Sequence, residues 1–63
     1  MKFHIYKDKK KEWRWKLVAR NKNILADSGE GYKDYSTCKR AIFSIMRRAA
    51  DCDIYNEEIK LFV

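Results

Sequence analysis

The sequence predicts an α+β domain with the element order β-β-β-α-β, in which an antiparallel meander of three strands is covered on one face by one helix. Two patterns support this prediction. Apolar residues alternate with polar ones over much of residues 2–28, which is the period of half-buried strands. Over residues 36–50 they recur at intervals of three and four, which is the period of an amphipathic helix. The tail, residues 53–63, returns to strand-like composition.

We expect the first strand at residues 2–7, the second at residues 12–20 ("EWRWKLVAR") and the third at residues 24–28. The segments "DKKK" and "NKN" between them are typical of turns. The second strand has the clearest alternation, and its two faces consist of Trp13, Trp15, Leu17 and Ala19 on one side and Glu12, Arg14, Lys16, Val18 and Arg20 on the other. Because burying a tryptophan is strongly favourable, we expect the tryptophan face to be the one that the helix covers.

The helix is expected at residues 36–50, with Asp34 or Ser36 as its N-cap. One apolar stripe would face the sheet, and it consists of Cys38, Ala41, Ile42, Ile45 and Ala49. A second apolar group, Phe43, Met46 and Ala50, lies about 100° around the helix and needs a separate partner.

Size and charge limit the possible functions. A single domain of 63 residues buries only about 60% of the surface that its unfolded chain exposes, and its sheet keeps open edge strands. Pairing with a second copy would relieve both problems.

The net charge of +6 permits contact with polyanions without requiring it. No apolar run is long enough to cross a membrane, and in "MKFHIYKDKKK" the charges follow the apolar residues, unlike in a signal peptide, so we expect a cytoplasmic protein.

An ordered set of residues resembles the YegP-like family of small proteins of unknown function, over nearly all of residues 3–50. The matching positions are Phe3, Ile5, Tyr6, Lys7, Asp8, Trp13, Arg14, Trp15, Leu17, Ala26, Gly31, Tyr32, Cys38, Ile42, Ser44, Ile45 and Ala49. The resemblance implies a βββαβ unit that works as a pair, either as a tandem repeat in one chain or as two single-unit subunits, with one continuous sheet and exchanged C-terminal strands. It therefore implies a homodimer for this single unit, residues 1–63, and it implies no biochemical activity.

The chain departs from the family pattern at several positions. Lys11, Lys22 and Ala41 stand where the family often has glycine, so the geometry of the two turns is an open question. Phe43 and Met46 stand where it usually has charged residues, and an apolar tail follows. We hypothesise that the tail packs on these two side chains, in its own subunit or in the partner; the tail residues concerned are Ile59, Leu61 and Val63.

The sequence does not favour an enzyme, and we expect no catalytic residue, cofactor or metal ligand. His4, the single histidine, alternates with apolar residues and is expected on the wetter face of the sheet. Cys38 at the start of the helix is a possible nucleophile, but it also begins the apolar stripe, which favours burial. Two cysteines and one histidine cannot build a four-ligand zinc site. A helix would separate Cys38 from Cys52 by about 21 Å, too far for a disulfide.

The main prediction is therefore a homodimeric structural or protein-interaction module. The alternative is weak binding of single-stranded nucleic acid or another polyanion through the basic face of the first two strands. That face would consist of His4, Tyr6, Arg14, Lys16 and Arg20. On this reading the tryptophans belong to the core.

Overall fold

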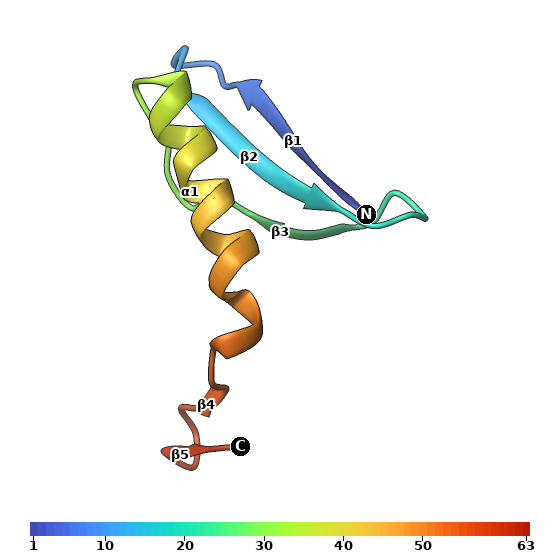
Figure 1. Ribbon diagram of the computed structural model, residues 1–63, viewed down its shortest axis with the longest axis vertical. Coiled ribbons are helices and arrows are strands. Elements are labelled where there is room, and N and C mark those ends of the chain that lie inside the picture. Colours follow the sequence, from blue (N-terminus) through green and yellow to red (C-terminus); the bar gives the residue numbers. More distant parts are fainter.

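A computed structural model describes all residues of the chain, 1–63 (Figure 1). Three strands form an antiparallel sheet in the order β1-β2-β3, and a second, two-stranded sheet consists of β4 and β5. The elements are β1 (Lys2–Lys7), β2 (Trp13–Val18), β3 (Ile24–Asp27), α1 (Tyr35–Arg48), the short 3₁₀ helix η1 (Ala49–Asp51), β4 (Tyr55–Asn56) and β5 (Leu61–Phe62). The predicted α+β meander with one helix is confirmed: β1 has the predicted bounds, and the ends of β2, β3 and α1 differ from the prediction by at most two residues.

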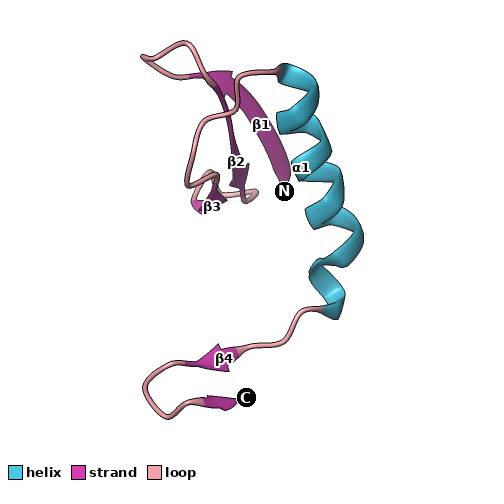
Figure 2. Ribbon diagram, turned by 90° about the vertical axis from the view of Figure 1, so that its left-hand side faces the viewer, coloured by secondary structure: helices cyan, strands magenta, loops and turns pink.

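The pairing of β1 with β2 separates the two faces of the sheet as the alternation predicts. Ile5 lies opposite Trp15 on the face toward α1, and His4 lies opposite Lys16 on the outer face. Partners that face each other across an antiparallel pair share one side of the sheet. Figure 2 shows α1 on one side of the sheet only, so the other side is not covered by any element of the chain.

The core forms where α1 meets β2. Trp15, Cys38 and Ile42 are buried, and partly buried side chains surround them, namely Phe3, Ile5, Trp13, Tyr32 and Ile45. The helix begins after Asp34, which is extended and makes no side-chain capping bond. Arg47 and Arg48 lie in its last turn, where cations interact favourably with the helix dipole.

Both turn lysines adopt the left-handed backbone that glycine tolerates best. The φ angles are 63° at Lys11 and 71° at Lys22. Asp8 accepts backbone hydrogen bonds in the first turn, and the Asn21 side chain accepts one from the Asn23 amide in the second. Lysine therefore occupies the left-handed region in both turns, at a cost of about 1 kcal/mol per residue relative to glycine.

The C-terminal segment corrects the prediction of a single strand. Residues 55–62 form a short hairpin, β4 and β5, in which the Tyr55 and Phe62 rings lie edge to face at 5.1 Å. The hairpin extends beyond the end of α1 and contacts neither the helix nor the three-stranded sheet (Figures 1 and 2). The tail therefore does not pack on the helix within its own subunit: Phe43, Met46, Ile59, Leu61 and Val63 are all exposed.

Candidate functional site

The outer face of the sheet brings together four of the five predicted binding residues. His4 lies opposite Lys16, and Tyr6 lies opposite Arg14. The Lys16 ammonium lies 5.5 Å from the centre of the Tyr6 ring. The fifth residue, Arg20, lies past the end of β2 in the β2–β3 turn. The predicted face is therefore continuous over β1 and β2, with Arg20 at one end.

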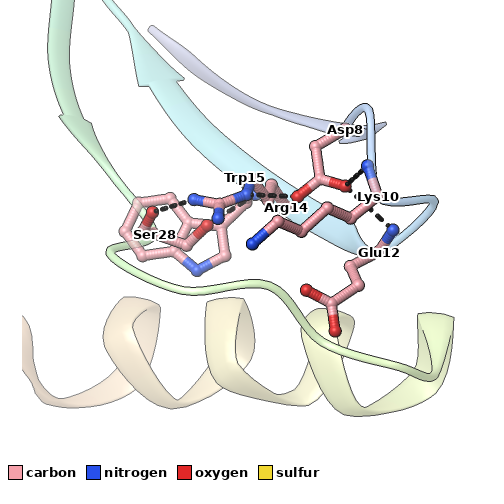
Figure 3. Close-up of polar contacts among 6 residues, drawn as sticks. All are labelled: Asp8, Lys10, Glu12, Arg14, Trp15 and Ser28. Atoms are coloured by element: carbon pink, nitrogen blue, oxygen red, sulfur yellow. Dashed lines mark hydrogen bonds and ion pairs between the residues drawn. The ribbon is translucent and has the colours of Figure 1, made fainter.

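Arg14 is held by the protein itself (Figure 3). Its Nε donates to Asp8 Oδ2 at 2.6 Å, and its Nη1 donates to the Ser28 carbonyl at 3.4 Å. The hydrogen bond from Arg14 lowers the pKa of the Asp8 carboxyl, and Asp8 in turn raises the pKa of Arg14. Since its charge is already compensated, Arg14 is poorly suited to bind an external anion.

Asp8 also organises the turn between β1 and β2. Its Oδ1 accepts the Lys10 amide at 2.9 Å and the Glu12 amide at 3.0 Å, as Figure 3 shows. An aspartate that accepts from its own following backbone is a common turn device. The Asp8–Arg14 pair therefore has a structural role, fixing this turn against the outer face of β2.

Ser28, at the end of β3, was not recognised in the sequence as a key residue. It is buried; its amide donates to the Trp15 carbonyl at 2.9 Å, and its Oγ accepts the Trp15 amide at 3.2 Å. The side chain thus takes the place of a strand carbonyl, and this leaves the Ser28 carbonyl free to accept from Arg14. The sequence did contain an indication of this role. The alternation of the third strand places Ser28 on the face toward the helix, and a buried polar side chain is expected to form a hydrogen bond.

A basic cavity of about 680 Å³ opens where the outer face reaches the β2–β3 turn. Its cationic lining side chains are Lys2, Lys16, Arg20 and Lys22, and His4 also lines it. Val18 and Ile24, which are paired across β2 and β3, add apolar surface. Lys2 and Lys22 were missing from the predicted site because a linear alternation does not show which turn residues fold back beside a strand.

An apolar groove of about 510 Å³ lies on the other face, between α1 and the adjoining ends of β1 and β2. Its apolar side chains include Phe3, Leu17, Ile42, Ile45, Met46 and Ala49. Met46 thus joins the groove, whereas Phe43 does not and instead lies exposed with the Lys39 ammonium 5.7 Å from its ring. Of the two residues predicted to receive the tail, only Met46 lies in an apolar recess.

The two cysteines are free thiols. Cys38 is fully buried in the core, and burial raises the pKa of its thiol, while Cys52 is exposed. No group of three or more histidine, cysteine, aspartate or glutamate side chains lies close enough together to hold a metal ion. The single long helix, α1, falls short of the length and apolarity that a membrane span requires.

Comparison with known proteins gives a family. The model of a domain of unknown function, DUF1508, matches residues 8–56. The chain belongs to this family. The resemblance to YegP-like proteins is thereby confirmed, and nothing in the family description gives DUF1508 proteins an activity.

Relatives within the DUF1508 family carry the label UPF0339. A UPF0339 protein of Neisseria meningitidis serogroup B is 50% identical over 42 residues, which cover 67% of this chain and 73% of the relative. A UPF0339 protein of Treponema denticola is 38% identical over 53 residues, which cover 84% of this chain and 90% of the relative. The solution structure of a protein from Haloferax volcanii aligns with a TM-score of 0.82 at 44% identity, covering 87% of this chain and 92% of that one.

Proposed function

We propose that this protein is a non-enzymatic interaction module that works as a homodimer, in which the C-terminal hairpin of each copy packs on the apolar groove of the other. One observation carries the proposal: the groove and the hairpin are both apolar, and they do not meet within one chain. The proposal keeps the exchanged tail and the Met46 contact expected from the sequence, and it replaces the Phe43 contact with the other apolar side chains of the groove that Met46 lines.

Exposed apolar surface on the tail supports this arrangement. The large apolar side chains Ile54, Tyr55, Ile59, Leu61, Phe62 and Val63 are each about half exposed or more. Only four of 63 residues are buried, so the isolated chain has a very small core. Exposed apolar side chains gathered in one short segment are typical of an interface, and burying them in a partner would supply the stability that a small domain lacks.

A longer relative is consistent with a paired unit. A UPF0339 protein of Stutzerimonas stutzeri is 43% identical over 49 residues, which cover 78% of this chain but only 43% of the relative. More than half of that protein lies outside the match, which leaves room for a second unit of similar size in one chain. A single-unit chain would obtain the same pairing by association.

The cavities offer little to support catalysis. The side chains that line them are lysine, arginine, one histidine and apolar groups, with no serine, threonine or cysteine nucleophile. Cys38 lines neither cavity, and the raised pKa of its buried thiol opposes formation of the reactive thiolate.

The test is the mass in solution, measured by light scattering and by sedimentation over a concentration series. We expect a dimer for the full chain and a monomer for a chain truncated after Tyr55. Met46→Glu, which places a charge in the groove, should dissociate the dimer while leaving the far-UV circular dichroism unchanged. Ser44→Glu is the matched control, since it adds the same charge at an exposed helix position that lines neither cavity.

A monomeric full chain at several hundred micromolar would overturn the proposal. A truncated chain that still sediments as a dimer would overturn the assignment of the hairpin to the interface. Because Met46→Glu leaves the hairpin intact, it separates loss of the interface from loss of the tail.

A further inference from the structure

The basic cavity beside the β2–β3 turn is lined by four cationic side chains that form no ion pair within the protein. The chain has one ion pair, Asp8–Arg14, and none of the cavity's lysines or its arginine takes part in it. Asp27 lies opposite Lys16 on the outer face without forming an ion pair with it. Like charges gathered in a concave site repel one another, and an anion that binds there relieves the repulsion.

The turn that carries two of these cations is well defined. The Lys22 amide donates to the Ala19 carbonyl at 2.9 Å, and the Ala19 amide donates to the Asn23 carbonyl at 2.8 Å. These bonds and the positive φ of Lys22 fold the turn so that Arg20 and Lys22 both line the cavity. Lys2 and Lys16 complete it from β1 and β2. A site whose backbone is fixed in this way loses less entropy when a ligand binds.

The cavity is not only cationic. Val18 and Ile24 lie among the charges, and Ile24 is 59% exposed. An inorganic anion would gain nothing from this apolar surface, whereas a ligand with both a phosphate and a flat apolar part would use the two together. The volume, about 680 Å³, lies within the range of roughly 300–1,000 Å³ that is usual for small-ligand sites.

We propose that this cavity binds a nucleotide, with its base over Val18 and Ile24, and with its own phosphates or the adjoining phosphates of a strand on Lys16, Arg20 and the neighbouring lysines. The nucleotide comes either free in solution or as one unit of a single-stranded nucleic acid. The site shares Met1 and Lys2 with the apolar groove, whereas His4, Lys16, Val18, Ala19, Arg20, Lys22 and Ile24 line this cavity and not the groove. The proposed binding residues differ from those predicted from the sequence: Arg14 is left out because it is paired with Asp8, and Lys2 and Lys22 are added.

The experiment measures binding of a fluorescently labelled ten-nucleotide oligothymidylate by anisotropy, at 25–250 mM salt. If three or four phosphates are neutralised, the slope of log affinity against log salt should be about −2 to −3, so that affinity falls about 20- to 50-fold between 50 and 200 mM salt. Competition with free thymidine monophosphate and triphosphate distinguishes a free nucleotide from a single strand as the ligand. If the free nucleotides displace the oligothymidylate at an equal concentration of phosphate groups, the ligand is a free nucleotide. If they displace it only weakly, the ligand is a single strand. No binding at 25 mM salt would overturn the proposal.

Paired charge variants locate the site. Lys16→Gln with Arg20→Gln should weaken binding at least about tenfold and make the salt slope shallower by about 1.4, the value for two lost phosphate contacts. Lys9→Gln with Lys10→Gln is the control, because it changes the net charge equally in the turn at the other end of the sheet (Figure 1). An equal loss of affinity in both double variants would show that only net charge matters and would overturn the site.

The apolar part of the site has its own test. Ile24→Ser should weaken binding of the oligothymidylate several-fold and leave binding of inorganic pyrophosphate unchanged. Equal effects on both ligands, or pyrophosphate and oligothymidylate of equal affinity for the unchanged chain, would overturn the assignment of a base to Val18 and Ile24. Circular dichroism of each variant confirms that it is folded.

Discussion

Asp8 and Arg14 form an ion pair with 2.6 Å between Oδ2 and Nε, which links the turn after β1 to the outer face of β2 (Figure 3). The same carboxylate accepts two amides of its own turn, and the same guanidinium reaches the Ser28 carbonyl at the end of β3. The pair therefore connects all three strands at one end of the sheet. It also engages the charge of the one arginine that sequence alternation had placed in β2 on the predicted binding face.

Asp8→Asn should destabilise the fold in a pH-dependent way. The pKa of Asp8 is lowered in the folded state, first by the hydrogen bond from Arg14, from an unfolded value of about 3.9. A lowered folded pKa contributes stability at pH values above the unfolded value, and this contribution is lost as pH falls through the folded value. Urea denaturation should therefore show the largest difference in unfolding free energy between wild type and variant at pH 6, and a smaller difference at pH 2.5.

Asparagine keeps the Oδ1 acceptor for the turn amides, so the variant isolates the charge of Asp8. Asp53→Asn serves as its control, because Asp53 is exposed and forms no ion pair. A difference between Asp8→Asn and wild type that is the same at both pH values would contradict a role for the carboxylate charge.

The two glycines should respond differently to alanine. A Cβ at Gly31 would lie 2.7 Å from Glu12 Cβ and 2.5 Å from Glu12 Oε1, so the neighbouring chain must shift. Gly31→Ala should therefore cost about 1–3 kcal/mol, the usual range for overpacking. Gly29 has nothing within 4 Å of such a Cβ, and neither glycine has a positive φ. Gly29→Ala should leave stability unchanged or raise it by up to about 1 kcal/mol.

Thermal and urea unfolding of the two alanine variants measure this difference directly. Equal destabilisation by both would mean that the close approach of Gly31 to Glu12 is not what requires glycine. Since Tyr32 pairs with Trp13 through two backbone hydrogen bonds, a shift at Gly31 should also appear in the amide resonances of Trp13 and Tyr32.

The two thiols should react at very different rates. Cys52 is exposed, whereas Cys38 is fully buried and burial raises the pKa of its thiol. Toward a disulfide reagent at pH 8, we expect Cys38 to react at least about 100-fold more slowly, because it must wait for the core to open. In the Cys52→Ser variant only Cys38 can react, and urea, which unfolds the protein, should increase its rate of reaction. Similar rates for both thiols in the native protein would contradict the burial of Cys38.

Much of the fold follows from local pattern. Alternation in "EWRWKLVAR" places Trp15 toward the helix and Lys16 away from it, because successive side chains in a strand point to opposite faces. The change to helical spacing places Cys38 and Ile42 in the core. The faces of the candidate site could therefore be predicted, as could the order of the first four elements.

The tail was harder to predict. "YNEEIKLFV" has the composition of one strand, but Asn56 accepts the amides of Glu58 and Ile59, and Lys60 takes a φ of 56°, so the chain turns back on itself. Such side-chain and backbone bonds compete with an extended strand at similar energy, and a short apolar pattern does not decide between them.

The sequence by itself determined the strands and helix of the body and which side chains share a face, because these depend on periods of two and 3.6 residues along the chain. The ordered set of motif residues, and not the periodicity, indicated the family. Only the tertiary structure decided which cations are free. Arg14 and Lys16 look equivalent in the sequence, yet Asp8, six residues before Arg14, folds over to pair with the arginine alone. Lys22 joins Lys16 because a turn returns it to the end of the sheet. Contacts of this kind depend on distances through space, which a linear pattern does not contain.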